Sequence, residues 1–399
     1  MNIGFVSTRF AGVDGVSLET LKLVDALKAL GHDSFYCAGE LDNVSIPSQL
    51  VPRMMFNDPA ILALNDAAFG STPLDRHQLY AEADALRGEL EAFIDQYNID
   101  VLFPQNASCI PMNLPLGIAI RDVVERRQIP TICHHHDFYW ERERFMHNQV
   151  QDILDTAFPP NLQPIQHITI NTIMQKRLKS WRGIDAVYLP NVFDFSQPAP
   201  SAPDGVREAL GIQADDIVFL QATRVIRRKG IEKSIELVRK LNDPRIILII
   251  TGSEHDEPGG YGTWLKEEAD RAGIRYRFIA DKIDMQGGDT VYSLWDIYPI
   301  ADFVTYPSVY EGFGNALIET VYFRKPFIVH TYPMYLTDIQ SVGVRGVEFS
   351  YDITPDVLDN VRRVLHDPAE MVERNFEAAK RAFGYDRLRD TLQGLLANV

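Results

Sequence analysis

The chain has 399 residues, of which 46% are hydrophobic and 24% charged, and its formal net charge at pH 7 is −16. This length allows two domains, each with a substantial core. Because neither half of the chain carries an excess of lysine and arginine, the composition disfavours nucleic acid or an anionic membrane surface as a partner.

The three cysteines, Cys37, Cys109 and Cys133, are odd in number, and each lies in or beside an apolar run. We interpret them as reduced core thiols rather than disulfide partners or zinc ligands. The N-terminus enters a strand without the basic and apolar regions of a signal peptide, and no apolar run has membrane-spanning length. We therefore expect a cytoplasmic protein with no integral membrane segment.

The chain begins with a strand at residues 3–7, a glycine-bearing loop, a helix at 16–30 and a second strand at 33–38. This order is typical of a parallel sheet covered by helices. The loop between Gly12 and Gly15 lacks the pattern G-x-G-x-x-G, which disfavours a nicotinamide or flavin cofactor.

Residues 43–74 contain four prolines and predict an irregular excursion over the surface, of the kind that forms substrate loops or lids. The strand and helix alternation then resumes, and it predicts helices at 79–96, 113–127 and 172–181 and strands at 100–104, 130–133, 168–170 and 186–189.

The strand at 130–133 runs directly into His134-His135-His136-Asp137. Three consecutive histidines cannot share one side of an extended chain, so a zinc site is a minority interpretation. Ligands collect at the carboxyl ends of parallel strands, and we therefore favour a substrate-contacting imidazole, His136 beside Asp137, with His134 and His135 as alternates. The competing interpretation is a polar loop with a buried, hydrogen-bonded histidine.

Arg142 and Arg144 follow this run. They are candidates for binding an anionic acceptor, together with His135 and Asp137. The alternative is that they pair with Glu141 and Glu143 on an exposed helix.

A segment rich in proline, serine and alanine at 196–203 marks the best domain boundary in the chain. A second series follows, with strands predicted at 217–222, 246–250, 276–279, 303–305 and 327–329, helices at 231–241, 264–272 and 292–297, and a helical tail from about Pro355. We expect an α/β protein with two Rossmann-like, doubly wound parallel sheets facing a cleft, followed by C-terminal helices. The predicted domains are 1–195 and 196–380, with a C-terminal helix at 381–399 that packs back on the first.

The most informative stretch runs from Val304 to Val321 and predicts a buried strand, a tight turn and a helix. A carboxylate, Glu311 or Glu319, stands at each edge of the turn. The helix would open with unpaired amides at Asn315, Ala316 and Leu317, which can bind an anion. The alternative is a strand-to-helix corner with surface acids.

Arg224 and Lys229 follow another strand of the same predicted sheet, so they can converge with the start of this helix. Two cations and a helix N-terminus form a receptor for a diphosphate. Because these groups neutralise the anion, a D-x-D metal site is not required, and we predict no metal ligands.

Thr-Arg224-x4-Lys229-Gly230, followed by Glu311-Gly-Phe-Gly-Asn-Ala-Leu-Ile-Glu319, resembles the retaining nucleotide-sugar glycosyltransferases of family 4, which have the GT-B fold. The resemblance extends to the glycine loop, to His136-Asp137 and to the element Pro190-Asn191-x-x-Asp194. The loop differs from that of the family in lacking an adjacent glycine pair.

The resemblance implies a retaining transfer of a hexose from a nucleotide diphosphate sugar, a donor substrate rather than a prosthetic group, to a small soluble hydroxyl acceptor. It implies catalytic roles for His136, Arg224, Lys229 and Glu311. The residues implied to bind the donor are Gly15, Gly312, Phe313, Gly314, Asn315, Ala316, Leu317 and Glu319. Alternatives are a sugar phosphorylase of the same family, a nucleotide-sugar epimerase and a non-catalytic nucleotide-sugar sensor. Homo-oligomerisation is left open.

Overall fold

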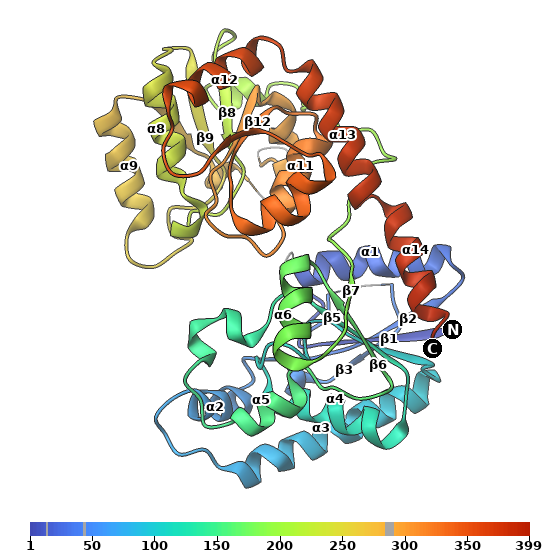
Figure 1. Ribbon diagram of the computed structural model, residues 1–399. Coiled ribbons are helices and arrows are strands. Elements are labelled where there is room, and N and C mark those ends of the chain that lie inside the picture. Colours follow the sequence, from blue (N-terminus) through green and yellow to red (C-terminus); the bar gives the residue numbers. More distant parts are fainter. Residues whose placement is uncertain (13–14, 43–44, 284–290) are drawn as a thin grey trace. The chain divides into compact units, whose positions relative to one another are not determined.

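A computed structural model gives the fold of the chain (Figure 1) and describes residues 1–12, 15–42, 45–283 and 291–399. The chain divides into two compact units. The first unit comprises Met1–Val192 and Tyr385–Val399, and the second comprises Phe193–Gly384.

The first unit is built on a parallel sheet with strand order β3-β2-β1-β4-β5-β6-β7. Its strands are β1 (Asn2–Ser7), β2 (Asp33–Ala38), β3 (Ser48–Leu50), β4 (Val101–Pro104), β5 (Thr131–His135), β6 (Ile165–Thr169) and β7 (Val187–Tyr188). Its helices are α1 (Gly15–Ala29), α2 (Pro59–Ala68), α3 (Arg76–Tyr97), α4 (Leu114–Arg127), α5 (Gln151–Ala157), α6 (Thr172–Arg182) and α14 (Tyr385–Leu396).

Both faces of the first sheet are covered, which explains why its central strands β1 and β4 are mostly apolar and buried. Helices α3 and α4 pack on one face, and α1 and α14 pack on the other, where leucines of α14 join the core around Leu23 and Leu27 (Figure 1). Gly4 of β1 allows the close approach of α3, because a Cβ there would lie 2.8 Å from the Phe93 ring.

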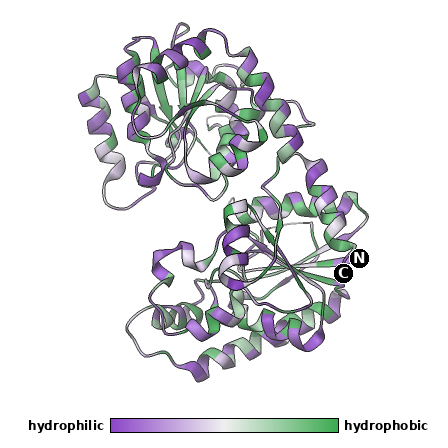
Figure 2. Cartoon of the chain, viewed as in Figure 1, coloured by the Kyte–Doolittle hydropathy of each residue, from purple (hydrophilic) through white to green (hydrophobic). Residues whose placement is uncertain are grey.

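The three cysteines are buried and free of disulfides, which confirms their predicted place as reduced core thiols. Strand residues are mostly hydrophobic, and hydrophilic residues lie along the outer sides of the helices (Figure 2). Across the described ranges, no helix is long and apolar enough to cross a membrane.

The prediction of an irregular excursion over residues 43–74 is wrong for much of that range, because β3 and α2 lie within it. Two of the four prolines that suggested a loop, Pro52 and Pro59, occupy first turns of helices, where a missing N–H costs nothing. Pro59 opens α2, and the Asp58 side chain caps it by accepting from the Ala60 and Ile61 amides at 3.0 and 3.3 Å. The start of the segment, Asn43 and Val44, lies outside the described residues.

The second unit has a parallel sheet with strand order β10-β9-β8-β11-β12-β13. Its strands are β8 (Ile217–Gln221), β9 (Ile246–Ile250), β10 (Arg275–Phe278), β11 (Phe303–Tyr306), β12 (Phe327–His330) and β13 (Val347–Phe349). Its helices are α7 (Val206–Ala209), α8 (Ile231–Leu241), α9 (Tyr261–Ala272), α10 (Leu294–Ile297), α11 (Asn315–Tyr322), α12 (Pro355–His366) and α13 (Ala369–Phe383). Since β8 and β11 are neighbours in this sheet, the loops that follow them lie at one edge.

Candidate functional site

The loops after β8 and β11 touch at the carboxyl edge of the second sheet. The Val309 amide donates to the Arg228 carbonyl at 2.8 Å. Gly230 has a φ of +61°, and a Cβ there would lie 2.6 Å from the Pro307 carbonyl oxygen. Glycine at this position therefore permits both the left-handed backbone and the close contact between the loops.

A buried carboxylate held by two cations lies where these loops meet. The Lys229 ammonium donates to Oε1 of Glu311, and the Arg228 guanidinium donates to Oε2 at 2.6 Å. Burial by itself would raise the pKa of Glu311, but the attraction of Lys229 and Arg228 outweighs it and lowers that pKa. Burial lowers the pKa of Lys229, and Glu311 opposes this shift. The two cations therefore favour the carboxylate form of Glu311, and Glu311 in turn favours the ammonium form of Lys229.

Two buried tyrosines border this carboxylate. The Tyr306 ring lies 5.9 Å from the Lys229 ammonium, and burial together with the charge of Glu311 keeps the phenol pKa of Tyr306 and Tyr332 well above the usual range. Gly314 has a φ of +121°, and a Cβ there would lie 2.9 Å from the Tyr332 hydroxyl oxygen. The second glycine of the turn is thus required by both backbone and packing.

The helix after this turn is α11, and its first turn is tight. The Leu317 amide donates to the Gly314 carbonyl at 2.9 Å, so the prediction of an unpaired donor at Leu317 is wrong. Asn315 and Ala316 begin the helix and are half-buried, as is Gly312. Phe313 is buried, with its ring 5.4 Å from that of Phe383.

Glu319 lies on α11 and is half-buried. Its Oε2 accepts a hydrogen bond from the Tyr298 hydroxyl at 3.2 Å, and the same hydroxyl lies 3.1 Å from the Ala316 carbonyl oxygen. This phenol partner has no signature in the motif, because Tyr298 precedes β11.

Arg224 follows β8 and is exposed, and its guanidinium donates to the Asp256 carbonyl at 3.1 Å. The Asp256 carboxylate accepts from the Val225 amide at 2.7 Å and from the Ser253 amide at 3.0 Å. The loop after β9 is therefore fastened to the loop that carries Arg224.

The histidine run ends β5 in the first unit. His134 and His135 are buried, with His134 Nδ1 3.0 Å from Gln105 Oε1 and His135 Nε2 2.9 Å from His167 Nδ1. Burial lowers the pKa of both imidazoles well below its usual value. His136 comes just after the strand and is half-buried. The structure thus places the two alternates inside the sheet and His136 at its carboxyl end.

Asp137 is paired with Arg142 rather than open to solvent. Its Oδ2 accepts from Arg142 Nε at 2.6 Å, and its Oδ1 accepts from the Asn106 amide at 3.0 Å. The alternative prediction paired Arg142 and Arg144 with the neighbouring glutamates. Among the described residues, Arg142 instead pairs with Asp137, and Glu141 pairs with Arg177 at 3.2 Å.

The Arg144 guanidinium contacts the Met112 sulfur and lies 4.4 Å from the Phe145 ring. Within the described part of the chain, no carboxylate lies within ion-pair distance of Arg144. Burial and the nearby charge of Arg142 lower its pKa, and Asp137 opposes that shift.

Gly15 is exposed and begins α1. Gly12 has a φ of +68°, and its amide donates to the Asp42 carboxylate at 2.6 Å. Val13 and Asp14, the centre of the predicted glycine loop, lie outside the described residues.

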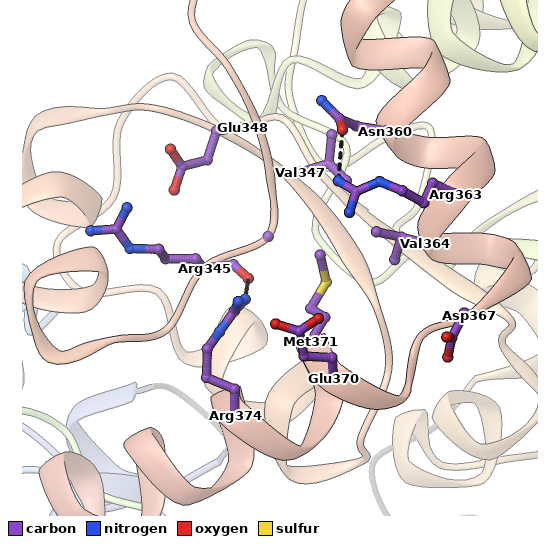
Figure 3. A pocket seen from close by; sticks show the side chains of 11 residues that line it. Arg345, Val347, Glu348, Asn360, Arg363, Val364, Asp367, Glu370, Met371 and Arg374 are labelled. Carbon is purple, nitrogen blue, oxygen red and sulfur yellow. Dashed lines mark hydrogen bonds between the residues drawn. The ribbon is translucent and has the colours of Figure 1, made fainter.

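A separate pocket of about 400 Å³ lies near the amino end of β13 (Figure 3). Two of its arginines make neutral contacts: Arg374 donates to the Arg345 carbonyl at 2.9 Å, and Arg363 donates to the Asn360 side-chain oxygen at 2.7 Å. The pocket shares no lining residue with the Arg228, Lys229 and Glu311 cluster at the carboxyl edge.

Comparison with known proteins identifies relatives of the whole chain. Residues 204–382 match the family model described as glycosyl transferases group 1. The mannosylglucosylglycerate synthase of Thermotoga maritima is 32% identical, over 98% of this chain and 99% of that protein.

Solved structures share the fold at low sequence identity. A glycosyltransferase from Rickettsia africae has a TM-score of 0.72 at 16% identity, covering 100% of this chain and 99% of that one. Anabaena HepE in complex with UDP-glucose has a TM-score of 0.65 at 13% identity, and the match covers 100% of both chains.

Proposed function

The chain belongs to the group 1 glycosyl transferases, enzymes of the GT-B fold, and we propose that it moves a hexose from a nucleoside diphosphate sugar to a small hydroxyl acceptor with retention of configuration. The observation that carries this proposal is the convergence of Arg228, Lys229 and Glu311 at the carboxyl edge of the second sheet, beside the start of α11.

We propose that Arg224 and Lys229 bind the donor diphosphate and that Glu319 accepts hydrogen bonds from the ribose hydroxyls. In the structure, the Glu311 carboxylate forms an ion pair with the Lys229 ammonium. A diphosphate would take over that cation and leave Glu311 held by Arg228. The carboxylate would then be available to a hydroxyl of the transferred sugar. The amides and backbone from Gly312 to Leu317 would border the sugar and phosphate.

In the reaction, the bond between the anomeric carbon and the diphosphate oxygen breaks, and a bond to the acceptor oxygen forms on the same face. The acceptor proton passes to a phosphate oxygen. Negative charge develops on the leaving diphosphate, so the preorganised cations Arg224 and Lys229 contribute most of the stabilisation. Because these cations neutralise the leaving group, we propose that no metal is needed. His136 would stabilise the positive charge at the sugar.

The acceptor we propose is a small glycosylated acid. The Thermotoga relative, whose name specifies mannosylglucosylglycerate synthesis, is similar along nearly its full length. Among the described residues, no carboxylate lies within ion-pair distance of Arg144. We propose that a carboxylate of the acceptor forms an ion pair with this guanidinium. Gly15, Asp137 and Arg142 would border the substrates, whereas buried His135 would support this edge through His167.

The test is transfer of radiolabelled hexose from GDP-mannose or UDP-glucose to glucosylglycerate, with the product anomer assigned by NMR and the rate measured with and without EDTA. We expect a retained configuration and an unchanged rate with EDTA. Disaccharide cleavage only with phosphate would instead identify a phosphorylase. A new nucleotide sugar formed without acceptor would identify an epimerase, and binding without turnover would identify a sensor.

A further inference from the structure

Asn106 holds the corner at which the chain leaves β5. It follows β4 by two positions and has a φ of +58°, in the left-handed region. Its own amide donates to the His134 carbonyl at 2.9 Å. Its side-chain oxygen accepts from the backbone amide of His136 at 2.9 Å, and its side-chain nitrogen donates to Asp137 Oδ1 at 3.0 Å. One side chain therefore fixes two consecutive residues of the predicted site.

The orientation of this carboxamide is set by its surroundings. Its Oδ1 also lies 2.9 Å from the Cys109 sulfur. Burial, followed by the charge of Asp137, raises the pKa of that thiol well above its usual value, so the sulfur stays protonated and donates. Two donors thus face the Asn106 oxygen and a carboxylate faces its nitrogen, an arrangement that only one flip of the amide satisfies.

The same interactions restrain Asp137 from both sides, because its second oxygen accepts from Arg142 Nε at 2.6 Å. The result is a chain of contacts from Cys109 through Asn106 and Asp137 to Arg142. Other left-handed residues of the described chain serve a different purpose. Asn242, for example, has a φ of 52°, caps the end of α8 and is exposed.

We propose that Asn106 is a positioning residue for sugar transfer, which acts by holding the His136 backbone and the Asp137 carboxylate in their working places. This inference rests on the proposed function, in which His136 stabilises the reacting sugar. Misplacing a catalytic group slows the chemical step more than it weakens substrate binding. We therefore expect loss of the Asn106 side chain to lower mainly kcat.

The experiment compares Asn106→Gly, His136→Ala and the double variant in the full chain, with GDP-mannose or UDP-glucose as donor and glucosylglycerate as acceptor. Glycine keeps the left-handed backbone and removes only the side chain. We expect Asn106→Gly to lower kcat about ten- to a hundredfold with little change in the donor KM. The matched control, Asn242→Gly, removes an asparagine side chain from a left-handed position elsewhere and should keep wild-type kcat.

If Asn106 acts through His136, the double variant is no slower than His136→Ala. Independent, multiplicative losses would overturn the inference, as would wild-type kcat in Asn106→Gly. An inactive wild-type chain would overturn the proposed function, and with it the role of Asn106. An active chain that needs His136 but tolerates Asn106→Gly would overturn only the inference.

A second variant separates positioning from folding. Asn106→Asp places a carboxylate against Asp137, and the two acids must share a proton. We expect its kcat to recover as the pH falls, and Asn106→Asp combined with Asp137→Asn to restore much of the loss by recreating an amide and carboxylate pair. A kcat of Asn106→Asp that does not respond to either change would contradict the proposal.

Discussion

Lys229 and Glu311 lie 82 residues apart in sequence and form a buried ion pair between the loops that follow β8 and β11. Their side chains are only 11% and 7% exposed. Lys229 is the cation that we propose binds the donor diphosphate. In the structure, Glu311 is paired with that same cation.

Replacing Lys229 with alanine should remove a charge-assisted contact to the leaving group. We expect a loss of about 2–4 kcal/mol of transition-state stabilisation, or about 30- to 1,000-fold in kcat/KM. Steady-state kinetics with the preferred donor measures this loss. Lys233→Ala is the control, because Lys233 pairs with Glu236 on the surface of α8. Near-normal turnover of Lys229→Ala would reject the diphosphate assignment.

Glu311→Gln should destabilise the free protein, because two cations then lose the carboxylate between them. We expect a decrease of about 3 kcal/mol in the free energy of unfolding, measured by urea denaturation. A nucleoside diphosphate should raise Tm more in this variant than in the wild type, since its charge replaces that of Glu311.

The control for this variant is Glu236→Gln. Glu236 also accepts from two cations, Lys233 at 2.9 Å and Lys240 at 2.6 Å, but on a more exposed helix face. It should cost less than about 1 kcal/mol. An equal decrease in the free energy of unfolding in the two variants would show that burial does not increase the contribution of Glu311 to stability.

Glu319→Ala should weaken binding of the nucleoside diphosphate, because a carboxylate that accepts from ribose hydroxyls is lost. Loss of a hydrogen bond to a charged group predicts a Kd raised about tenfold or more. Isothermal titration calorimetry with UDP and GDP measures it. Tyr298→Phe removes only the hydroxyl that donates to Glu319 and should have a smaller effect. An unchanged Kd in Glu319→Ala would count against the ribose contact.

Arg144→Gln should raise the acceptor KM about tenfold or more while leaving the donor KM unchanged, because a charge-assisted contact to the acceptor carboxylate is removed. The methyl ester of the same acceptor should lose this sensitivity. Arg126→Gln, an exposed arginine on α4, is the control. Equal sensitivity of acid and ester would place the acceptor carboxylate elsewhere.

Stability should fall as the pH is lowered from neutrality. Burial lowers the pKa of His167 from 6.5 to about 4, and its partner His135 is also kept neutral by burial. Between those pH values the unfolded chain binds protons that the folded chain excludes. The free energy of unfolding should therefore decrease with falling pH, by up to about 1.4 kcal/mol per pH unit for each histidine.

Urea denaturation at about pH 7 and pH 5 measures this slope. His167→Gln should reduce it, whereas His147→Gln, which alters an exposed histidine, should not. An equal slope in wild type and His167→Gln would show that burial of this histidine does not govern acid stability.

The sequence predicted the architecture well because parallel strands buried on both faces are continuous apolar runs, as in Ile246–Ile250. It also brought the loops of Lys229 and Glu311 together correctly, because both follow strands of one sheet. The side-chain contacts at that edge of the sheet were harder to predict from the sequence. Arg227, Arg228 and Lys229 are consecutive basic residues, and the 3₁₀ turn that they form determines that the last two reach Glu311.

The contacts of Asn106 could not be predicted from the sequence. Its partners His136 and Asp137 lie about 30 residues away, and no local sequence pattern indicates that they meet. The burial of His134 and His135 depends on how far β5 extends, and strand ends are set by tertiary pairing. Here β5 continues through His135 beside Thr169. Pro52 and Pro59 led to the wrong prediction of a loop, because in the structure they begin helical turns.

The C-terminal helix α14 supplies Leu388, Leu392 and Leu395 to the core of the unit that begins at Met1. During synthesis on the ribosome, residues 1–192 of that unit emerge before the second unit, yet they lack these leucines until residues 385–399 have been made. Its apolar surface over α1 stays uncovered while the whole of the second unit is translated. Chaperone demand in the nascent chain should therefore be concentrated on the first unit, although it is the earlier of the two to emerge.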